Sequence, residues 1–403
     1  MAKSLKSIEI SKEFGHISCS ERHFSEEGVM RHVVCPVCGS ICIKYGKTGS
    51  GAQRWFCKSC KAAFSPQIDN SAKRLQIFLD WLFSKKTQKE MPGEGRTFRR
   101  KTSEFWKVWP MPPKVEEKRD VVYVDGIYLG RKACILICCD DEHVLGWYLC
   151  REEHSMAWEA LMSRIAEPSF VVTDGGTGFS KALKKVWPKA SKQRCTFHAF
   201  SQVRRYTTTR PRTAAGIELY ALSRELLHVE KKSEADDWTE RFRSWVVRYK
   251  EFLSQRTRDE NGNLVYTHER LLKAENSLIR LLKEGSLFRY TDEQLRERSG
   301  DLPATNNRIE GGVNARLREM LREHRGLSIE RRIKAVFWWC YMHSPRPLSA
   351  TEILKVMPTD KSISDIYRRM SRGSRLKKAI PGWGDAVVWE ELHRSSNYPE
   401  LWS

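Results

Sequence analysis

Short apolar runs and amphipathic stretches alternate through the middle of the chain. The runs at 121–130, 132–143 and 144–154 are rich in β-branched and aromatic residues, and the tight connections between them predict an antiparallel meander. The pattern then predicts a helix, a strand, a helix and a last strand, over 155–166, 169–176, 177–187 and 192–198. Strands and helices mixed in this order indicate a mixed α/β domain.

Changes in this pattern divide the chain into seven predicted segments. Helical periodicity dominates on both sides of the α/β region, and the two ends are polar. The segments are a polar N-terminal stretch (1–30), a cysteine-containing segment (31–66), a helical pair (67–117), the first part of the α/β domain (118–212), an all-helical insertion (213–298), two helices that complete the domain (299–345) and a basic, irregular tail (346–403).

The charge of the chain points to a polyanionic partner. The formal net charge is +21 and the pI is near 9.5, with Lys and Arg spread along the sequence, which favours nucleic acid over a membrane surface. No apolar run reaches the ~20 residues that a membrane span requires. The N-terminus lacks the apolar core of a secretory signal, so we expect a reducing cytoplasm in which the twelve cysteines bind metal before they form disulfides.

Basic residues gather on the helical pair of segment 67–117. Leu75, Phe78, Leu79 and Leu82 share one helical face, and the sequence "MPGEG" separates them from the anchors Phe98, Phe105, Trp106 and Trp109. Two helices around such a break resemble a helix-turn-helix that binds DNA. The candidate phosphate contacts are Arg96, Arg99, Arg100 and Lys101, with Arg204 and Arg205 and the tail at 368–378 as further ones. A solvated amphipathic pair is the alternative.

The insertion carries an aromatic stripe at helical spacing. It consists of Trp238, Phe242, Trp245, Tyr249 and Phe252, and the leucines of 271–282 offer a facing core. Stacking on unpaired bases is one use of such rings, but a packed helical core is the favoured interpretation.

Four cysteines have the spacing of a zinc site. Cys35, Cys38, Cys57 and Cys60 form C-x2-C-x18-C-x2-C, and two β-like arms with a Gly-rich turn lie between the pairs. The pattern predicts a zinc ribbon whose closed, four-thiolate site stabilises the fold without performing chemistry. Cys19 and Cys42 lack partners at suitable spacing and are expected to be bystanders.

Two aspartates lie on predicted strands. Asp125 lies in the first strand of the α/β domain and Asp174 ends the fourth. The strand order is that of the ribonuclease-H-like fold, in which these two strands are neighbours, so the carboxylates should meet and bind Mg²⁺. Read alone, Asp174-Gly175-Gly176 is merely a turn after a buried strand.

Glu310 is the candidate for a third carboxylate. Asn314 lies one turn later on the same face, beside the apolar stripe of Ile309, Val313, Leu317 and Met320. Gly311 and Gly312 are costly inside a helix, which suggests a close approach of another backbone or of a ligand. Glu319 and Glu323 are rival acids with the pattern of a charged outer face.

In combination, these motifs resemble a bacterial insertion-sequence transposase of the Mutator-like DDE group. The resemblance rests on "VDG" at Asp125, "TDGG" at Asp174, "CTFH" at Cys195 to His198 and "TNNRIEGGVN" at Glu310. It implies that Asp125, Asp174 and Glu310 bind divalent metal, that Cys195 and His198 support the site, and that an all-helical insertion precedes the glutamate. A zinc half-site at the C-x2-H element is the weaker alternative to a structural role.

The resemblance implies a transposase that acts at the bacterial nucleoid. It would bind the terminal inverted repeats of its element as a homo-oligomer, cleave DNA by Mg²⁺- or Mn²⁺-dependent hydrolysis and join the 3′ ends to target DNA. Two alternatives remain: a purely hydrolytic ribonuclease-H-like nuclease, and a non-catalytic DNA-binding regulator derived from a transposase.

Overall fold

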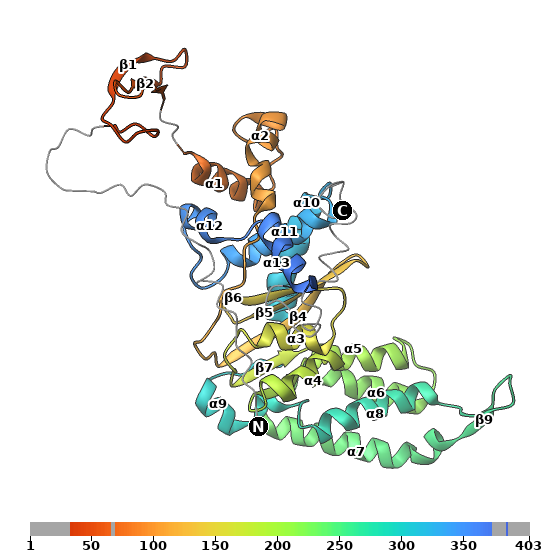
Figure 1. The fold of residues 1–403 in the computed structure, drawn as a ribbon. Coiled ribbons are helices and arrows are strands. Elements are labelled where there is room, and N and C mark those ends of the chain that lie inside the picture. Colours follow the sequence, from red (N-terminus) through yellow and green to blue (C-terminus); the bar gives the residue numbers. More distant parts are fainter. Residues whose placement is uncertain (1–32, 66–68, 373–383, 386–403) are drawn as a thin grey trace. The chain divides into compact units, whose positions relative to one another are not determined.

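The computed structural model describes residues 33–65, 69–372 and 384–385, with the side chains of 367–372 excepted (Figure 1). The chain forms two compact units, Met1–Asp69 and Asn70–Ser403. The predicted N-terminal segment 1–30, Cys19 and the basic stretch 373–378 of the tail lie outside the described residues. Among the described residues, no helix has the length and apolar character that crossing a membrane requires.

The first unit contains a small antiparallel sheet. Its strands are β1 (Ile43–Lys47), β2 (Gln53–Phe56) and β3 (Ala63–Phe64), in the order β1-β2-β3. The first two strands are the arms predicted from the sequence, and Gly51 closes the turn between them at a φ of +84°. Cys35, Cys42 and Cys57 form the small core of this unit.

The second unit is built on a five-stranded sheet in the order β6-β5-β4-β7-β8. The predicted meander is confirmed, since β4, β5 and β6 pair antiparallel, and the first and fourth strands, β4 and β7, are parallel neighbours. The strand bounds are β4 (Val121–Leu129), β5 (Ala133–Cys139), β6 (Val144–Cys150), β7 (Phe170–Thr173) and β8 (Ser191–Arg194).

The predicted strand over 192–198 is half wrong. Strand β8 ends at Arg194, and Cys195 is the N-cap of helix α5 (Thr196–Thr207). Ala199, Phe200 and Val203 are buried along this helix. Residues 196–198, predicted as strand, therefore belong to a helix whose buried positions follow a 3.6-residue period.

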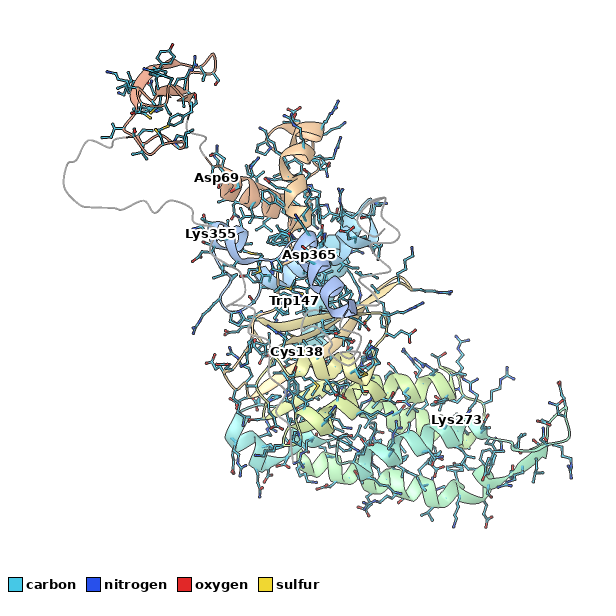
Figure 2. The ribbon with its side chains drawn as sticks, viewed as in Figure 1. Asp69, Cys138, Trp147, Lys273, Lys355 and Asp365 are labelled. Carbon is cyan, nitrogen blue, oxygen red and sulfur yellow. The ribbon has the colours of Figure 1, made fainter. Side chains whose placement is uncertain are left out.

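Both faces of the sheet are covered, as the two-residue period of its strands requires. Val122 and Val124 of β4 pack with helices α3 (Ser155–Met162) and α4 (Thr177–Val186), while Tyr123 and Ile127 face a second, larger core. Figure 2 labels one buried side chain of each core, Cys138 and Trp147. The ring of Trp147 lies 6.0 Å from that of Phe337 on α11 (Ile329–Met342).

The helical pair over 67–117 packs into the larger core. Helix α1 (Ser71–Leu82) is followed by α2 (Glu94–Thr102) and a 3-10 turn, η2 (Ser103–Lys107), and the eight predicted face and anchor side chains are buried. The ring of Phe78 lies 4.9 Å from that of Trp106. Gly93 and Gly95 have positive φ, so the predicted break between the helices is confirmed.

The insertion is mainly helical but not wholly so. Its helices are α6 (Ala214–Glu225), α7 (Lys232–Ser254), α8 (Glu269–Lys283) and α9 (Glu293–Ser299), with the 3-10 turn η3 (Arg289–Thr291). A hairpin of β9 (Arg256–Arg258) and β10 (Leu264–Tyr266) corrects the all-helical prediction. Its turn forms because Asp259 accepts from the backbone of Asn261 and Asn263, and Gly262 has a φ of +79°.

The aromatic stripe of the insertion is a packed core, as favoured from the sequence. Trp238, Phe242 and Trp245 are buried, and their rings stack at centroid distances of 5.3 and 6.1 Å along α7. Tyr249 and Phe252 are half-buried against the same core. These rings are therefore used for packing.

The C-terminal part contains more regular structure than predicted. Segment 299–345 forms η4 (Arg308–Asn314), a π-helix that continues into α10 (Ala315–Glu323), and then α11. The tail was expected to be irregular, yet it begins with α12 (Ala350–Val356) and α13 (Asp360–Arg372). Helix α12 is stabilised by a capping box between Ser349 and Glu352.

Candidate active site and metal-binding groups

Asp125 and Asp174 occupy equivalent positions on neighbouring parallel strands. The last paired residues of β4 and β7 are Val124 and Thr173, and each aspartate is the next residue along its chain. Parallel neighbours lie about 4.8 Å apart, so the two aspartates lie side by side at the point where β7 ends and β4 continues to Leu129 beside β5. Strands of an open α/β sheet present their carboxyl ends to ligands.

The turn after β7 fixes the orientation of Asp174. The backbone N–H of Gly176 donates to its Oδ1 at 3.0 Å, and the N–H of Gly175 donates to Oγ1 of Thr173. Gly175 has a φ of +88°, and a Cβ there would lie 2.5 Å from Cζ of Arg194. A glycine is therefore required at position 175 for two reasons: its φ is positive, and the guanidinium of Arg194 occupies the space that a Cβ would take.

The π-helix η4 packs over β4 through two asparagines. Nδ2 of Asn314 donates to Oδ2 of Asp125 at 2.7 Å, and Nδ2 of Asn306 donates to the carbonyl of Val124 at 3.1 Å. Single π-turns inside helices often mark functional sites. Among the described residues, the close approach at Gly311 is to the side chain of Asn307, on the preceding turn of the same segment, and not to another backbone; the predicted approach of a ligand stays a prediction.

Burial and mutual repulsion act on the carboxylates. Burial raises the pKa of Asp125 to about 6, and the charge of Asp174 acts in the same direction. Burial also raises the pKa of Glu310 to about 7, with contributions from Asp125 and Asp174. The charge of Asp174 thus acts on Asp125, and the charges of both aspartates act on Glu310, as like charges that a bound cation would neutralise.

The carboxylate of Glu310 lies beside Cys195 and His198, the two residues of the C-x2-H element. Nδ1 of His198 lies 3.3 Å from Oε1 of Glu310, and the ligand atoms of Cys195, His198 and Glu310 are all within 4.8 Å of one another. Among the described residues, the four-cysteine group is the other cluster of three or more ligand atoms within this distance. Asp125 and Asp174 belong to neither cluster, so they lie farther from Glu310 than Cys195 and His198 do. Burial lowers the pKa of His198.

The structure adds Glu153, which the sequence analysis did not single out. This residue follows β6, and its pKa is raised to about 7 by burial and then by the charges of Asp174 and Asp125. The signal was available: β6 is antiparallel to β5 and hence parallel to β4, so its carboxyl end lies at the same edge of the sheet.

The predicted basic contacts lie on two helices. Arg96, Arg99 and Arg100 on α2 line a hollow of about 320 Å³ together with Arg331, Trp81 and Trp106, and Lys101 is exposed beside them. Arg204 and Arg205 are exposed in the last turn of α5. Four guanidinium groups around one hollow provide an anion-binding surface.

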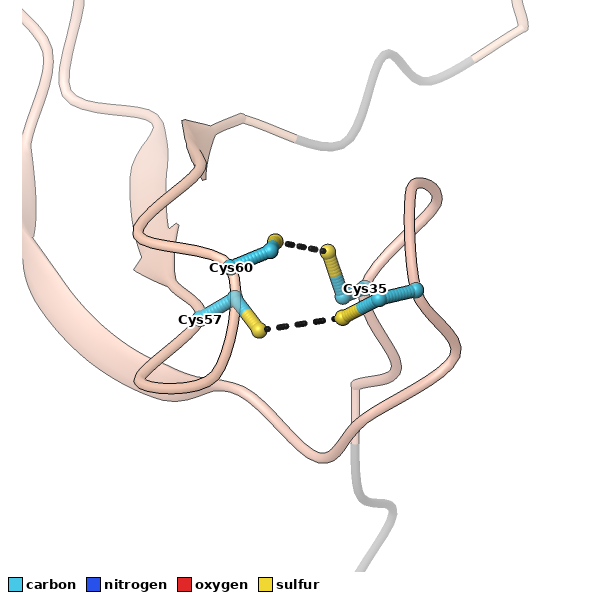
Figure 3. Close-up of side chains that lie close together, drawn as sticks. Cys35, Cys57 and Cys60 are labelled. Atoms are coloured by element: carbon cyan, nitrogen blue, oxygen red, sulfur yellow. Dashed lines mark hydrogen bonds between the residues drawn. The ribbon is translucent and has the colours of Figure 1, made fainter.

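The four predicted zinc ligands form one group (Figure 3). The Sγ atoms of Cys35 and Cys60 are 3.5 Å apart, as are those of Cys38 and Cys57. Four sulfurs at about 2.3 Å from a tetrahedral Zn²⁺ are separated by roughly 3.8 Å, so this group fits zinc. Cys42 is buried nearby but lies outside the group, as expected.

Comparison with known proteins bears on the central part of the chain. Residues 133–284 match the model of the family described as Transposase, Mutator family. This range includes Asp174, the C-x2-H element and the insertion up to residue 284, whereas Asp125 and Glu310 lie outside it. A search of curated proteins found no match. Over residues 133–284, the chain is therefore similar to the Mutator family of transposases.

Proposed function

We propose that this protein is a Mutator-like transposase and a DDE enzyme, and that its catalytic carboxylates are Asp125, Asp174 and Glu310. The observation that carries the proposal is the register of β4 and β7, which gives the two aspartates equivalent positions at one edge of the sheet. Asn314 links Asp125 to the π-helix that bears Glu310. A ribonuclease-H-like fold, interrupted by the helical insertion, accounts for this strand order.

The donor atoms of the site suit a divalent cation. Oδ1 of Asn306 and Oδ1 of Asn314 are buried and lack hydrogen-bond partners within the described part of the chain, and the carboxylate of Glu310 lies beside His198. Oxygen donors of this kind are the ligands that Mg²⁺ and Mn²⁺ prefer. A cation would also remove the repulsion that raises the pKa of Asp125 and Glu310.

In the proposed reaction, the chain orients the groups that act on DNA. Bound divalent cations would activate the attacking oxygen and stabilise charge on the phosphate. Asn314 holds Asp125 in orientation, the Gly176 N–H does so for Asp174, and Arg194 offsets negative charge beside Asp174 and Glu310. Water would attack first, and the freed 3′ hydroxyl would then attack target DNA.

The remaining parts are assigned to recognition. The helical pair α1 and α2 would bind the element ends, with Arg96, Arg99, Arg100 and Lys101 on phosphates and further contacts from α5. The four-cysteine group would hold one structural Zn²⁺. Joining two ends requires two active sites, so a homo-oligomer on DNA is proposed as the working form.

A strand-joining assay tests this function. Duplexes that carry the sequences flanking the gene are incubated with the protein and Mg²⁺, and the cut strands and joined products are mapped. The proposal predicts cleavage at an element end followed by covalent joining of its 3′ strand to a second duplex. Cleavage without joining would favour the hydrolytic nuclease, and specific binding without either reaction would favour the non-catalytic regulator.

A further inference from the structure

The C-x2-H element acquires a third candidate ligand only in the folded chain. Cys195 is the N-cap of α5, and His198 lies one turn later on the same side of that helix. Glu310 comes from η4, which follows the insertion in sequence. One ligand atom of each residue lies within 4.8 Å of the other two. The fold thus supplies the partner that the cysteine and histidine lack in the sequence.

Backbone hydrogen bonds hold the start of α5 against the segment that leads into η4. The N–H of Thr196 donates to the carbonyl of Ala304 at 3.0 Å, and the N–H of Asn306 donates to Sγ of Cys195 at 3.3 Å. A backbone donor to sulfur orients the thiol and stabilises negative charge on it, as the outer partners of metal ligands do. The sulfur is therefore fixed next to the segment that carries Glu310.

The contact between His198 and Glu310 has the spacing of two metal ligands. Nδ1 of His198 lies 3.3 Å from Oε1 of Glu310, yet Nδ1 is buried and has no hydrogen-bond partner among the described residues, so the contact lacks hydrogen-bond geometry. Two ligand atoms that each lie about 2.1 Å from a tetrahedral Zn²⁺ are separated by roughly 3.4 Å. A shift of Sγ by roughly 1 Å or less would complete three corners of the tetrahedron.

The types of donor and their exposure suit an ion of the zinc class. Thiolate and imidazole ligands select Zn²⁺ and similar ions, whereas Mg²⁺ prefers oxygen ligands alone. Cys195 is buried, but the side chains of His198 and Glu310 are 31% and 29% exposed. An ion can therefore enter from solvent, and its fourth position stays open to water.

We propose that Cys195, His198 and Glu310 form a second transition-metal site, which binds Zn²⁺ with water as the fourth ligand. The ion would join α5 to η4, the elements on either side of the insertion in sequence. Three protein ligands hold zinc less tightly than four thiolates, so the purified chain contains one zinc and takes up a second when Zn²⁺ is added. Glu310 is shared with the proposed catalytic set, but zinc binding does not depend on the proposed function.

Zinc uptake by the full-length protein tests this site. The one-zinc chain is titrated with Zn²⁺ in the absence of DNA, and uptake is measured by calorimetry and metal analysis. The variants are Cys195→Ala and Cys340→Ala; Cys340 is a buried thiol of α11 outside both ligand clusters and serves as the matched control. We expect wild type and Cys340→Ala to take up a second equivalent and Cys195→Ala to lose it. Equal behaviour of the two variants, or a wild type that takes up no second zinc, would overturn the proposal.

Asp174→Asn separates this site from the aspartates. Asp174 belongs to the proposed catalytic set but not to the cluster of Cys195, His198 and Glu310. The second zinc should therefore remain in Asp174→Asn, and an excess of Mg²⁺ should not displace it from wild type. Loss of the second zinc in Asp174→Asn, with retention in Cys195→Ala, would place the ion among the carboxylates and overturn the proposal. Because DNA is absent, failure of the strand-joining assay leaves this result unchanged.

Thermal unfolding gives a second measurement that keeps the buried thiol in place. Added Zn²⁺ should raise the unfolding temperature of the one-zinc wild type, because the ion binds the folded chain. Glu310→Gln removes a ligand at a partly exposed position and should gain less from Zn²⁺, while Glu319→Gln should gain as much as wild type. A gain in Glu310→Gln equal to that of wild type would overturn the proposal.

Discussion

The side-chain amide of Asn314 donates a 2.7 Å hydrogen bond to Oδ2 of Asp125, which lies 189 positions earlier in the sequence. This bond joins the π-helix η4 to β4 and brings Glu310 over the edge of the sheet where both aspartates lie. The whole helical insertion lies between the two elements in sequence, so the candidate site exists only when the domain on both sides of the insertion is complete.

Glu310→Gln should abolish cleavage and joining while element ends are still bound. The substitution removes a cation ligand but leaves the basic helices untouched, and the lost negative charge would slightly favour DNA. Gel shift measures binding, and labelled ends with Mg²⁺ or Mn²⁺ measure the reactions. Glu319→Gln is the control, because Glu319 pairs with Lys85 at 2.7 Å on an exposed face. Normal cutting by Glu310→Gln with loss in Glu319→Gln would show that the third carboxylate is misassigned.

The difference in stability between wild type and Glu310→Gln should depend on pH when metal is removed. The pKa of Glu310 is raised from 4.5 to about 7, so the folded state binds the proton more tightly than the unfolded state. This stabilisation is present at acidic pH and is lost as the pH rises through about 7. In EDTA, unfolding by urea should therefore show similar stabilities at about pH 4, below the unfolded pKa of 4.5, and a more stable Glu310→Gln at about pH 8. A constant difference across this range would contradict the assignment.

Cys57→Ser should cost the protein its zinc. The four thiolates of the group would hold one zinc, so removing one of them leaves three ligands and an unfolded or loosened first unit. Metal analysis of the purified full-length chain should give one zinc for wild type and much less for Cys57→Ser. Cys42→Ser alters a buried thiol outside the group and should retain the zinc. Full zinc in Cys57→Ser would exclude the site.

Replacing Arg99 and Arg100 together by Ala should weaken binding to element ends and flatten its salt dependence. Both residues line the basic hollow, and each lost phosphate contact reduces the slope of log K against log salt by roughly 0.9. Fluorescence anisotropy over a series of salt concentrations measures both quantities. The control replaces Arg256 and Arg258 of the hairpin, which removes the same charge elsewhere. Equal losses in the two double variants would mean that only overall charge matters.

Lys334→Met should destabilise the second unit by about 3 kcal/mol, because it leaves two carboxylates without their cation in a largely buried place. Lys334 is fully buried, and its Nζ donates at 2.6 Å to Glu330, to Asp360 and to the carbonyl of Trp106. Urea unfolding measures the loss. Lys355→Met, at an exposed position of α12, should change stability by less than about 0.5 kcal/mol. Similar losses of stability in the two variants would contradict the stabilising role of the buried Lys334 on α11.

Local patterns were sufficient for much of the fold. The β-branched runs predicted β4 to β7, because a half-buried or buried strand needs such residues at a two-residue period. The thiol spacing predicted the four-cysteine group because two cysteines with two residues between them can reach one ion from a single turn. The sequence failed where two local tendencies compete, as at Cys195, where a strand ends and a helix begins without a Gly or Pro to mark the boundary.

Tertiary structure alone decided the details of the candidate site. The sequence by itself determined that Asp125 lies on the first strand of the domain, that Asp174 ends the fourth and that Glu310 lies on a helix, and the strand order predicted that the aspartates meet. Only the folded chain places Glu310 beside His198, bonds Asn314 to Asp125 and brings Glu153 into the space at Gly126. These contacts join residues far apart in sequence, and no local periodicity records them, because they depend on how the helices close over the edge of the sheet.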